Sequence, residues 1–106
     1  MELAFISREL RDSCQNITIA TLNYGELVAK HLLARLSDLR AADTLADLPS
    51  TLFEISPDHF GEITVRLTEK YNMALSVNHS KKPTDPHGAL VLNRIYRLKI
   101  NTIGVA

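Results

Sequence analysis

The chain has 106 residues, of which 45% are hydrophobic and 23% are charged, and it contains a single cysteine. This length predicts one domain, residues 1–106, that can bury a core without disulfides or a structural metal. Twelve basic and twelve acidic side chains cancel, which excludes an overall field that would draw the molecule onto nucleic acid. The first residues, MELAFISREL, have neither a signal-peptide pattern nor a membrane span, and one cysteine fits a reducing compartment, so a cytoplasmic protein is expected.

The N-terminal residues predict a strand followed by a helix. Residues 3–6 form a short apolar run that favours a strand, and Ser7 can cap a helix over residues 8–16. Leu10 and Cys14 would lie on the inner face of that helix. The next stretch, residues 17–24, is ambiguous, because its β-branched residues suit a strand while its position suits a helical extension or a turn.

Residues 26–42 predict the central helix of the domain. Val28, Leu32, Leu36 and Leu39 recur at spacings of three and four, which is typical of one apolar helix face. At about 1.5 Å per residue the helix would run roughly 25 Å and could cross a small sheet. A further turn over residues 44–48 would be capped by Asp43 and ended by the proline that follows.

The C-terminal half predicts the sheet. Apolar and polar residues alternate over residues 52–55, 61–67 and 71–77, and a short link at residues 68–70 makes the last two a hairpin. Residues 78–88 hold two prolines and a glycine and predict a projecting loop, after which residues 90–100 predict the closing strand. We therefore expect an α+β domain in which two N-terminal helices pack on a mainly antiparallel sheet of four to five strands, in the order β-α-α-β-β-β-β.

The run YGELVAKHLLARLSDLRAADTLADLPS, residues 24–50, together with a D-x-x-G turn at residues 58–61 and the strand pair after it, resembles the HigB-like branch of the RelE/ParE toxin superfamily. In that branch a tyrosine–glycine pair opens a helix reading R-L-x-x-L-R-A-A, and a D-L-P segment closes it. The resemblance implies the RelE/ParE-like fold and a toxin of a type II toxin–antitoxin module, a ribonuclease that cuts mRNA on the ribosome without a metal or cofactor. It also implies a partner, a HigA-like antitoxin with a helix-turn-helix domain, through which alone the toxin would meet operator DNA.

The residues that the resemblance makes reactive are partly replaced in this chain. Ser56 stands where the family has a lysine, His59 where it has an arginine, and Asn72 where it has the arginine that follows the strand tyrosine. The C-terminal residues 100–106 lack the family's D-Y-H. His59 is the remaining candidate catalytic acid or base. Its alternative reading is an exposed turn residue.

RNA binding is predicted at basic and aromatic side chains of the C-terminal half. The candidates are Arg66, Lys70, Lys81, Lys82, Arg94, Tyr96 and Arg97. An aromatic ring between two arginines can stack on a base while the guanidinium groups hold phosphates, although a tyrosine in a sheet beside edge arginines gives the same pattern. His79 and His87, eight residues apart without a cysteine or carboxylate pattern, do not predict a metal site.

Three functions follow from the resemblance and the replaced residues. The first is a toxin of a toxin–antitoxin pair in which RNA cleavage is weak, altered or absent. The second is a ParE-like toxin that poisons a protein target such as gyrase, since that branch lacks the ribonuclease residues too. The third is a non-catalytic binding module that keeps the scaffold for complex formation and operon autoregulation.

Overall fold

The elements follow each other in the order β-α-α-α-β-β-β-β in the computed structural model, which describes residues 1–57 and 60–106. The helices and strands are β1 (Glu2–Phe5), α1 (Arg8–Gln15), α2 (Ile17–Tyr24), α3 (Glu26–Ala41), β2 (Phe53–Ile55), β3 (Glu62–Arg66), β4 (Tyr71–Val77) and β5 (Arg97–Val105). Short 3₁₀ turns are η1 (Leu45–Asp47), η2 (Ser50–Leu52) and η3 (Leu92–Arg94).

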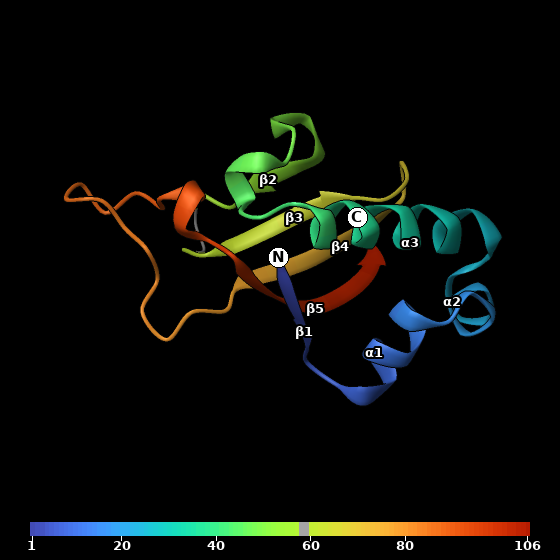
Figure 1. Cartoon of the computed structure of the whole chain (residues 1–106). Coiled ribbons are helices and arrows are strands. Elements are labelled where there is room, and N and C mark those ends of the chain that lie inside the picture. Colours follow the sequence, from blue (N-terminus) through green and yellow to red (C-terminus); the bar gives the residue numbers. More distant parts are fainter. Residues whose placement is uncertain (58–59) are drawn as a thin grey trace.

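The five strands form one sheet in the order β1-β5-β4-β3-β2. β1 runs parallel to β5, and the other neighbouring pairs are antiparallel. A register shift between Ala74 and Leu75 marks an irregularity in the β4–β5 ladder. The arrangement confirms the predicted α+β class and the mainly antiparallel sheet (Figure 1).

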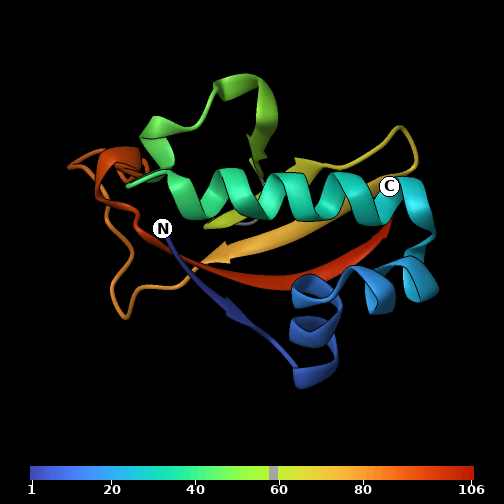
Figure 2. The ribbon, with the colours of Figure 1, turned by 45° about the vertical axis from the view of Figure 1, so that its right-hand side comes forward.

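The core lies between α3 and one face of the sheet. Figure 2 shows α3 crossing the strands, and Val28, Leu32, Leu36 and Leu39, predicted to share a helix face, are all buried. The sheet contributes the buried side chains Ile63, Val65, Met73, Leu75, Leu98 and Ile100. The opposite face, which we call the open sheet face, holds the residues that alternate with them. Its members include Glu62, Thr64, Arg66, Asn72, Ala74 and Ser76.

The prediction of two helices is wrong in number, because residues 17–24 form a helix of their own. Asn16 has extended backbone angles (φ −137°, ψ 116°), which end α1. Its side chain accepts hydrogen bonds from the backbone N–H groups of Thr18 (2.9 Å) and Ile19 (3.2 Å) and so caps α2. Gly25, at φ +88°, then separates α2 from α3. The cap of α1 is Ser7, as predicted.

The turn after α3 is capped by a different residue from the one predicted. Thr44, and not Asp43, precedes η1, and the Asp47 carboxylate accepts from the Thr44 backbone N–H at 3.0 Å. The pair forms a capping box, in which the two residues satisfy each other's backbone donors.

The last strand lies further along the chain than predicted. Residues 90–96 do not form a strand, because Leu90 makes only an isolated bridge and η3 follows it. Ile95 in this segment is fully buried. The carbonyl of Ile95 accepts from the backbone N–H of Leu45 at 2.9 Å, so this segment packs beneath η1. The strand is Arg97–Val105, and its end, which lies beyond the predicted strand, pairs with β4 through Tyr71 and Val105.

The first residue is tied to the far end of α3. The α-amino group of Met1 donates to the carbonyls of Leu39 (3.0 Å), Arg40 (3.1 Å) and Ala42. A cation at this position suits the negative end of the helix dipole. In the described residues, no helix combines the length and apolar character that crossing a membrane requires.

Candidate nucleic-acid interface

The loop between β4 and β5, residues 78–96, forms one end of the molecule, whose long axis is 45 Å. Figure 1 shows it projecting beyond the sheet. The loop has its own hydrogen bonds: Thr84 bridges Leu90, and the Asp85 carboxylate accepts from the N–H groups of His87 (2.8 Å) and Ala89 (3.0 Å). These bonds give the loop a defined shape.

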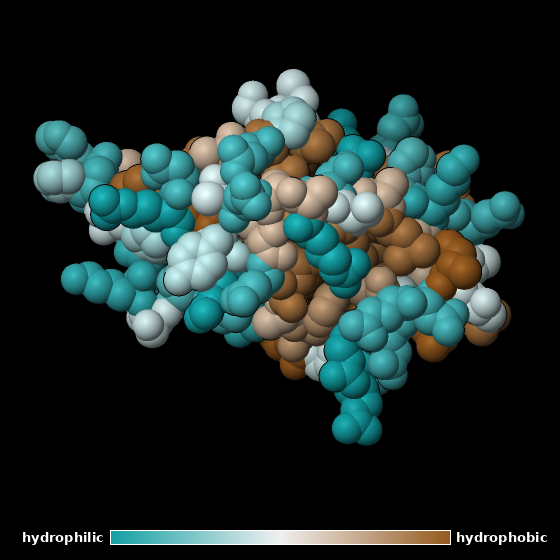
Figure 3. All heavy atoms as spheres, viewed as in Figure 1, coloured by the Kyte–Doolittle hydropathy of each residue, from teal (hydrophilic) through white to brown (hydrophobic). Residues whose placement is uncertain are grey.

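A cavity of about 700 Å³, which we call the loop groove, lies along this loop. Its lining residues are His79, Lys81, Lys82, Pro83, Thr84, Asn93, Arg94 and Tyr96. Lys81, Lys82 and Arg94 form no ion pair with any described residue. The surface at this end is mostly hydrophilic (Figure 3). Three cations around one cavity, none of them in an ion pair with a described residue, make an anion the ligand that the groove fits best.

Tyr96 sits in a small cluster at the edge of the loop groove. Its backbone N–H donates to Nε2 of His79 at 3.2 Å, and the two rings meet nearly at right angles with centroids 4.5 Å apart. The guanidinium of Arg97 lies 5.3 Å from the centre of the tyrosine ring, and its Nε is 2.6 Å from a carboxylate oxygen of Glu2. Arg97 is therefore already stacked and paired, whereas Arg94 is the arginine left to meet a phosphate.

Lys82 joins the loop to the start of β3. Gly61 has φ +83°, and a methyl group added there would come within 2.5 Å of Cε of Lys82. The lysine stem thus lies directly over the glycine backbone, which fixes where the ammonium group leaves the surface. The neighbouring candidate His59 lies outside the described residues.

Arg66 and Lys70 lie away from the loop groove. Lys70 precedes the first residue of β4 and the loop follows the last, and seven residues at about 3.3 Å each separate the two ends by roughly 20 Å. Arg66 pairs with Asn72 near the Lys70 end. The seven candidates therefore divide into a loop group and a distant pair.

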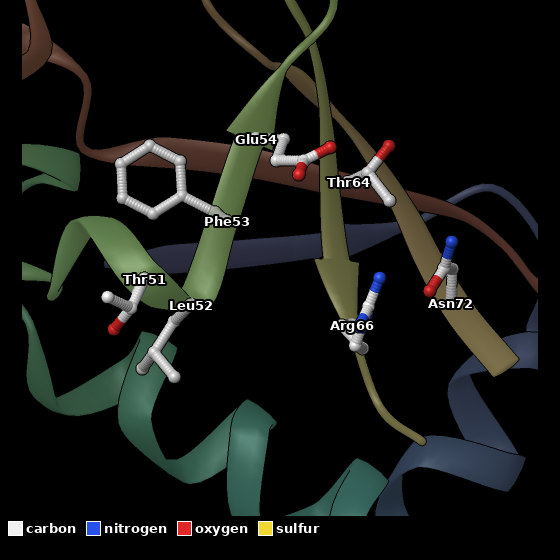
Figure 4. Close-up of a pocket in the computed structure, with 7 residues that line it drawn as sticks. All are labelled: Thr51, Leu52, Phe53, Glu54, Thr64, Arg66 and Asn72. Atoms are coloured by element: carbon white, nitrogen blue, oxygen red, sulfur yellow. The ribbon is translucent and has the colours of Figure 1, made fainter. Parts of the chain in front are cut away.

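Arg66 borders a shallow hollow of about 250 Å³ on the open sheet face (Figure 4). Glu54, Thr64 and Asn72 border it too. The side-chain oxygen of Asn72 is buried and has no hydrogen-bond partner among the described residues. A neutral amide thus occupies the position where the HigB-like pattern places an arginine.

The sequence did not reveal that His79 belongs with Tyr96. Their hydrogen bond joins residues 17 positions apart, and no spacing pattern predicts such a contact. Among the described residues, no three histidine, cysteine, aspartate or glutamate side chains gather in a way that could hold a metal ion.

Comparisons with protein-family models, curated proteins and solved structures find no match for this chain.

Proposed function

We propose that the chain is the toxin component of a type II toxin–antitoxin pair, HigB-like in kind, and that it acts on RNA held in the loop groove. The observation that carries the RNA assignment is the set of three cations, Lys81, Lys82 and Arg94, that surround one cavity and form no ion pair with a described residue. Phosphate contacts of this kind supply most of the affinity for nucleic acid. The sequence motif of residues 24–50, which forms α3 and η1, supports the toxin assignment and with it a helix-turn-helix antitoxin as partner.

Tyr96 gives the groove a second mode of contact. The ring is 46% exposed, so part of its surface is free to stack on an unpaired base. The Arg97 guanidinium lies against this ring, and Glu2 in turn pairs with Arg97. Stacking combined with phosphate contacts favours single-stranded RNA, whose bases are accessible.

Two versions of this function differ in whether RNA is cut. Cleavage requires a proton acceptor for the 2′-hydroxyl and stabilisation of the phosphorane charge. His79 is the imidazole that lines the groove, and its Nε2 is occupied by the Tyr96 N–H, so the neutral ring carries its proton on Nδ1. That arrangement, with Asn72 in place of an arginine, favours as second candidate a non-catalytic module that binds RNA and antitoxin only.

Binding of a fluorescent single-stranded RNA of mixed sequence tests the RNA assignment. We expect Lys81→Glu combined with Arg94→Glu to weaken binding at least about tenfold, a change of about 1.4 kcal/mol, because two phosphate contacts become repulsive. Arg66→Glu combined with Lys70→Glu is the matched control, since it makes the same charge change at the basic pair roughly 20 Å away. Equal losses in both variants would contradict a site in the loop groove.

Expression of the chain with and without the neighbouring gene tests the toxin assignment. Growth arrest with ribosome-dependent mRNA cuts, relieved by a helix-turn-helix partner, is the expected result. In that case His59→Ala and His79→Ala identify which imidazole serves the cleavage. Arrest with DNA-damage signalling would instead indicate a ParE-like target. RNA binding without arrest would indicate the non-catalytic module.

A further inference from the structure

The outer edge of β1 is an unused row of backbone hydrogen-bonding groups. In the parallel ladder with β5, the N–H groups of Glu2 and Ile6 donate to the carbonyls of Tyr96 (2.9 Å) and Ile100 (3.0 Å). Strand geometry alternates, so the N–H and C=O groups of Leu3 and Phe5 point to the other side. No described residue forms a backbone hydrogen bond with them.

Apart from its short length, this edge has few of the features that protect an exposed strand. β1 reads ELAF and contains no lysine, proline or glycine. Its one charged residue, Glu2, is neutralised by Arg97. Ile6, the residue that follows β1, is 60% exposed. Figure 2 shows β1 at the margin of the sheet. By contrast, β2 at the opposite edge has only three residues and carries Glu54, which forms no ion pair with a described residue.

We propose that β1 pairs antiparallel with β1 of a second copy of this chain, about a twofold axis that passes beside Ala4. In this register Leu3 faces Phe5 of the second copy, and Phe5 faces Leu3. These are the residues with outward backbone groups, so each such pair exchanges both of its hydrogen bonds. Ala4 faces its own equivalent in the closer, non-hydrogen-bonded type of pair.

The side chains are compatible with that register. Leu3 and Phe5 pack against the core and are only partly buried, so their exposed apolar parts would cover each other. Glu2 faces Ile6 of the second copy, which keeps the two glutamates apart. Ala4 lies on the open sheet face, where its small side chain permits the close approach at the axis. The edge is therefore self-complementary, as a twofold interface requires.

Charges placed at the axis test the pairing by sedimentation at several protein concentrations. The wild-type chain is expected to form a dimer. Ala4→Glu and Ala4→Lys, each alone, are expected to raise its dissociation constant about tenfold or more, because like charges then face each other. An equimolar mixture of the two variants is expected to recover dimers, because opposite charges now meet.

Ala74→Glu is the matched control. It adds the same charge to the same sheet face, but on the internal strand β4, where a second copy at β1 does not reach. Thermal unfolding of every variant verifies that the fold is retained. The proposal is overturned by a wild type that stays monomeric at every concentration, by a dimer that Ala4→Glu leaves intact, or by a mixture that remains monomeric. These outcomes do not depend on whether the loop groove binds RNA.

Discussion

Two glycines with the same backbone conformation differ in what surrounds them. Gly61 and Gly88 both have φ +83°, a region that side chains other than glycine rarely adopt. A methyl group at Gly61 would collide with the stem of Lys82, whereas one at Gly88 would meet no atom within 4 Å. Comparing alanine substitutions at the two glycines therefore distinguishes the effect of backbone strain from the effect of displacing the Lys82 side chain.

We predict that Gly61→Ala and Gly88→Ala each lower the free energy of unfolding by about 1 kcal/mol, because both force an alanine to positive φ. Only Gly61→Ala should also weaken RNA binding, since it displaces Lys82 from its place in the loop groove. Urea unfolding measures the first effect and fluorescence anisotropy with single-stranded RNA the second. If both variants bind RNA equally well, the position of the Lys82 stem over Gly61 is not needed for binding.

Cys14 should make stability depend on alkaline pH. Burial raises the pKa of its thiol to about 11, although the nearby Arg40 lowers it in part. The unfolded chain releases this proton near its ordinary pKa of 9.0 while the folded chain retains it, so the stabilisation is complete below about pH 9 and is lost as the pH rises toward 11.

We expect the free energy of unfolding to fall by about 2 to 3 kcal/mol across that range. Cys14→Ala should have a shallower dependence, measured by urea unfolding in a series of alkaline buffers. Some decline should remain, because burial also raises the pKa of Tyr24. An unchanged pH profile in Cys14→Ala would show that the thiol does not ionise on unfolding.

At the scale of elements, the sequence predicts those whose apolar pattern is periodic. α3 is found because its buried residues recur on one face, and the β3–β4 hairpin because its side chains alternate. α2 reads ITIATLNY, mixes apolar and polar residues around its circumference and buries only Ala20, so it offers no apolar stripe that would distinguish a helix from a strand. Its helical form depends on the Asn16 cap and on contact with α3.

The last strand shows a different limit of sequence reasoning. Residues 90–100 and 97–105 are both rich in apolar side chains, and either could pair with β4. Interactions between residues distant in sequence decide which segment pairs with β4. One is the backbone hydrogen bond between Leu45 and Ile95, and the other is the irregular β4–β5 pairing between Ala74 and Leu75.

The junction between α2 and α3 depends on Gly25. This residue has φ +88°, and a methyl group there would meet no atom within 4 Å, so a substitution is penalised by the backbone alone. We predict that Gly25→Ala lowers the free energy of unfolding by about 1 kcal/mol. Gly104→Ala is the control, because that glycine lies in β5 with equally open surroundings and no positive φ. Equal stability of both variants in urea would mean that the junction tolerates another conformation.

At the scale of the whole molecule, the proposed function depends on where charges gather and not on their sum. The net charge is zero, yet Lys81, Lys82 and Arg94 meet at one end of a body 45 Å long. The sequence marks these residues as basic, but it does not show that they share a cavity, nor that Arg66 and Lys70 lie elsewhere. Both facts depend on the three-dimensional path of the loop between β4 and β5.

A local cationic site on a neutral protein predicts a modest salt dependence of RNA binding. If the three cations each contact one phosphate, the logarithm of the binding constant should fall with the logarithm of salt concentration with a slope of about −2, since single strands contribute about 0.7 per contact. Arg94→Gln should make the slope less negative by about 0.7, whereas Lys70→Gln should leave it unchanged. Anisotropy titrations in a salt series measure both. A slope that responds to Lys70 as strongly as to Arg94 would place the RNA along the whole sheet and not at the loop end.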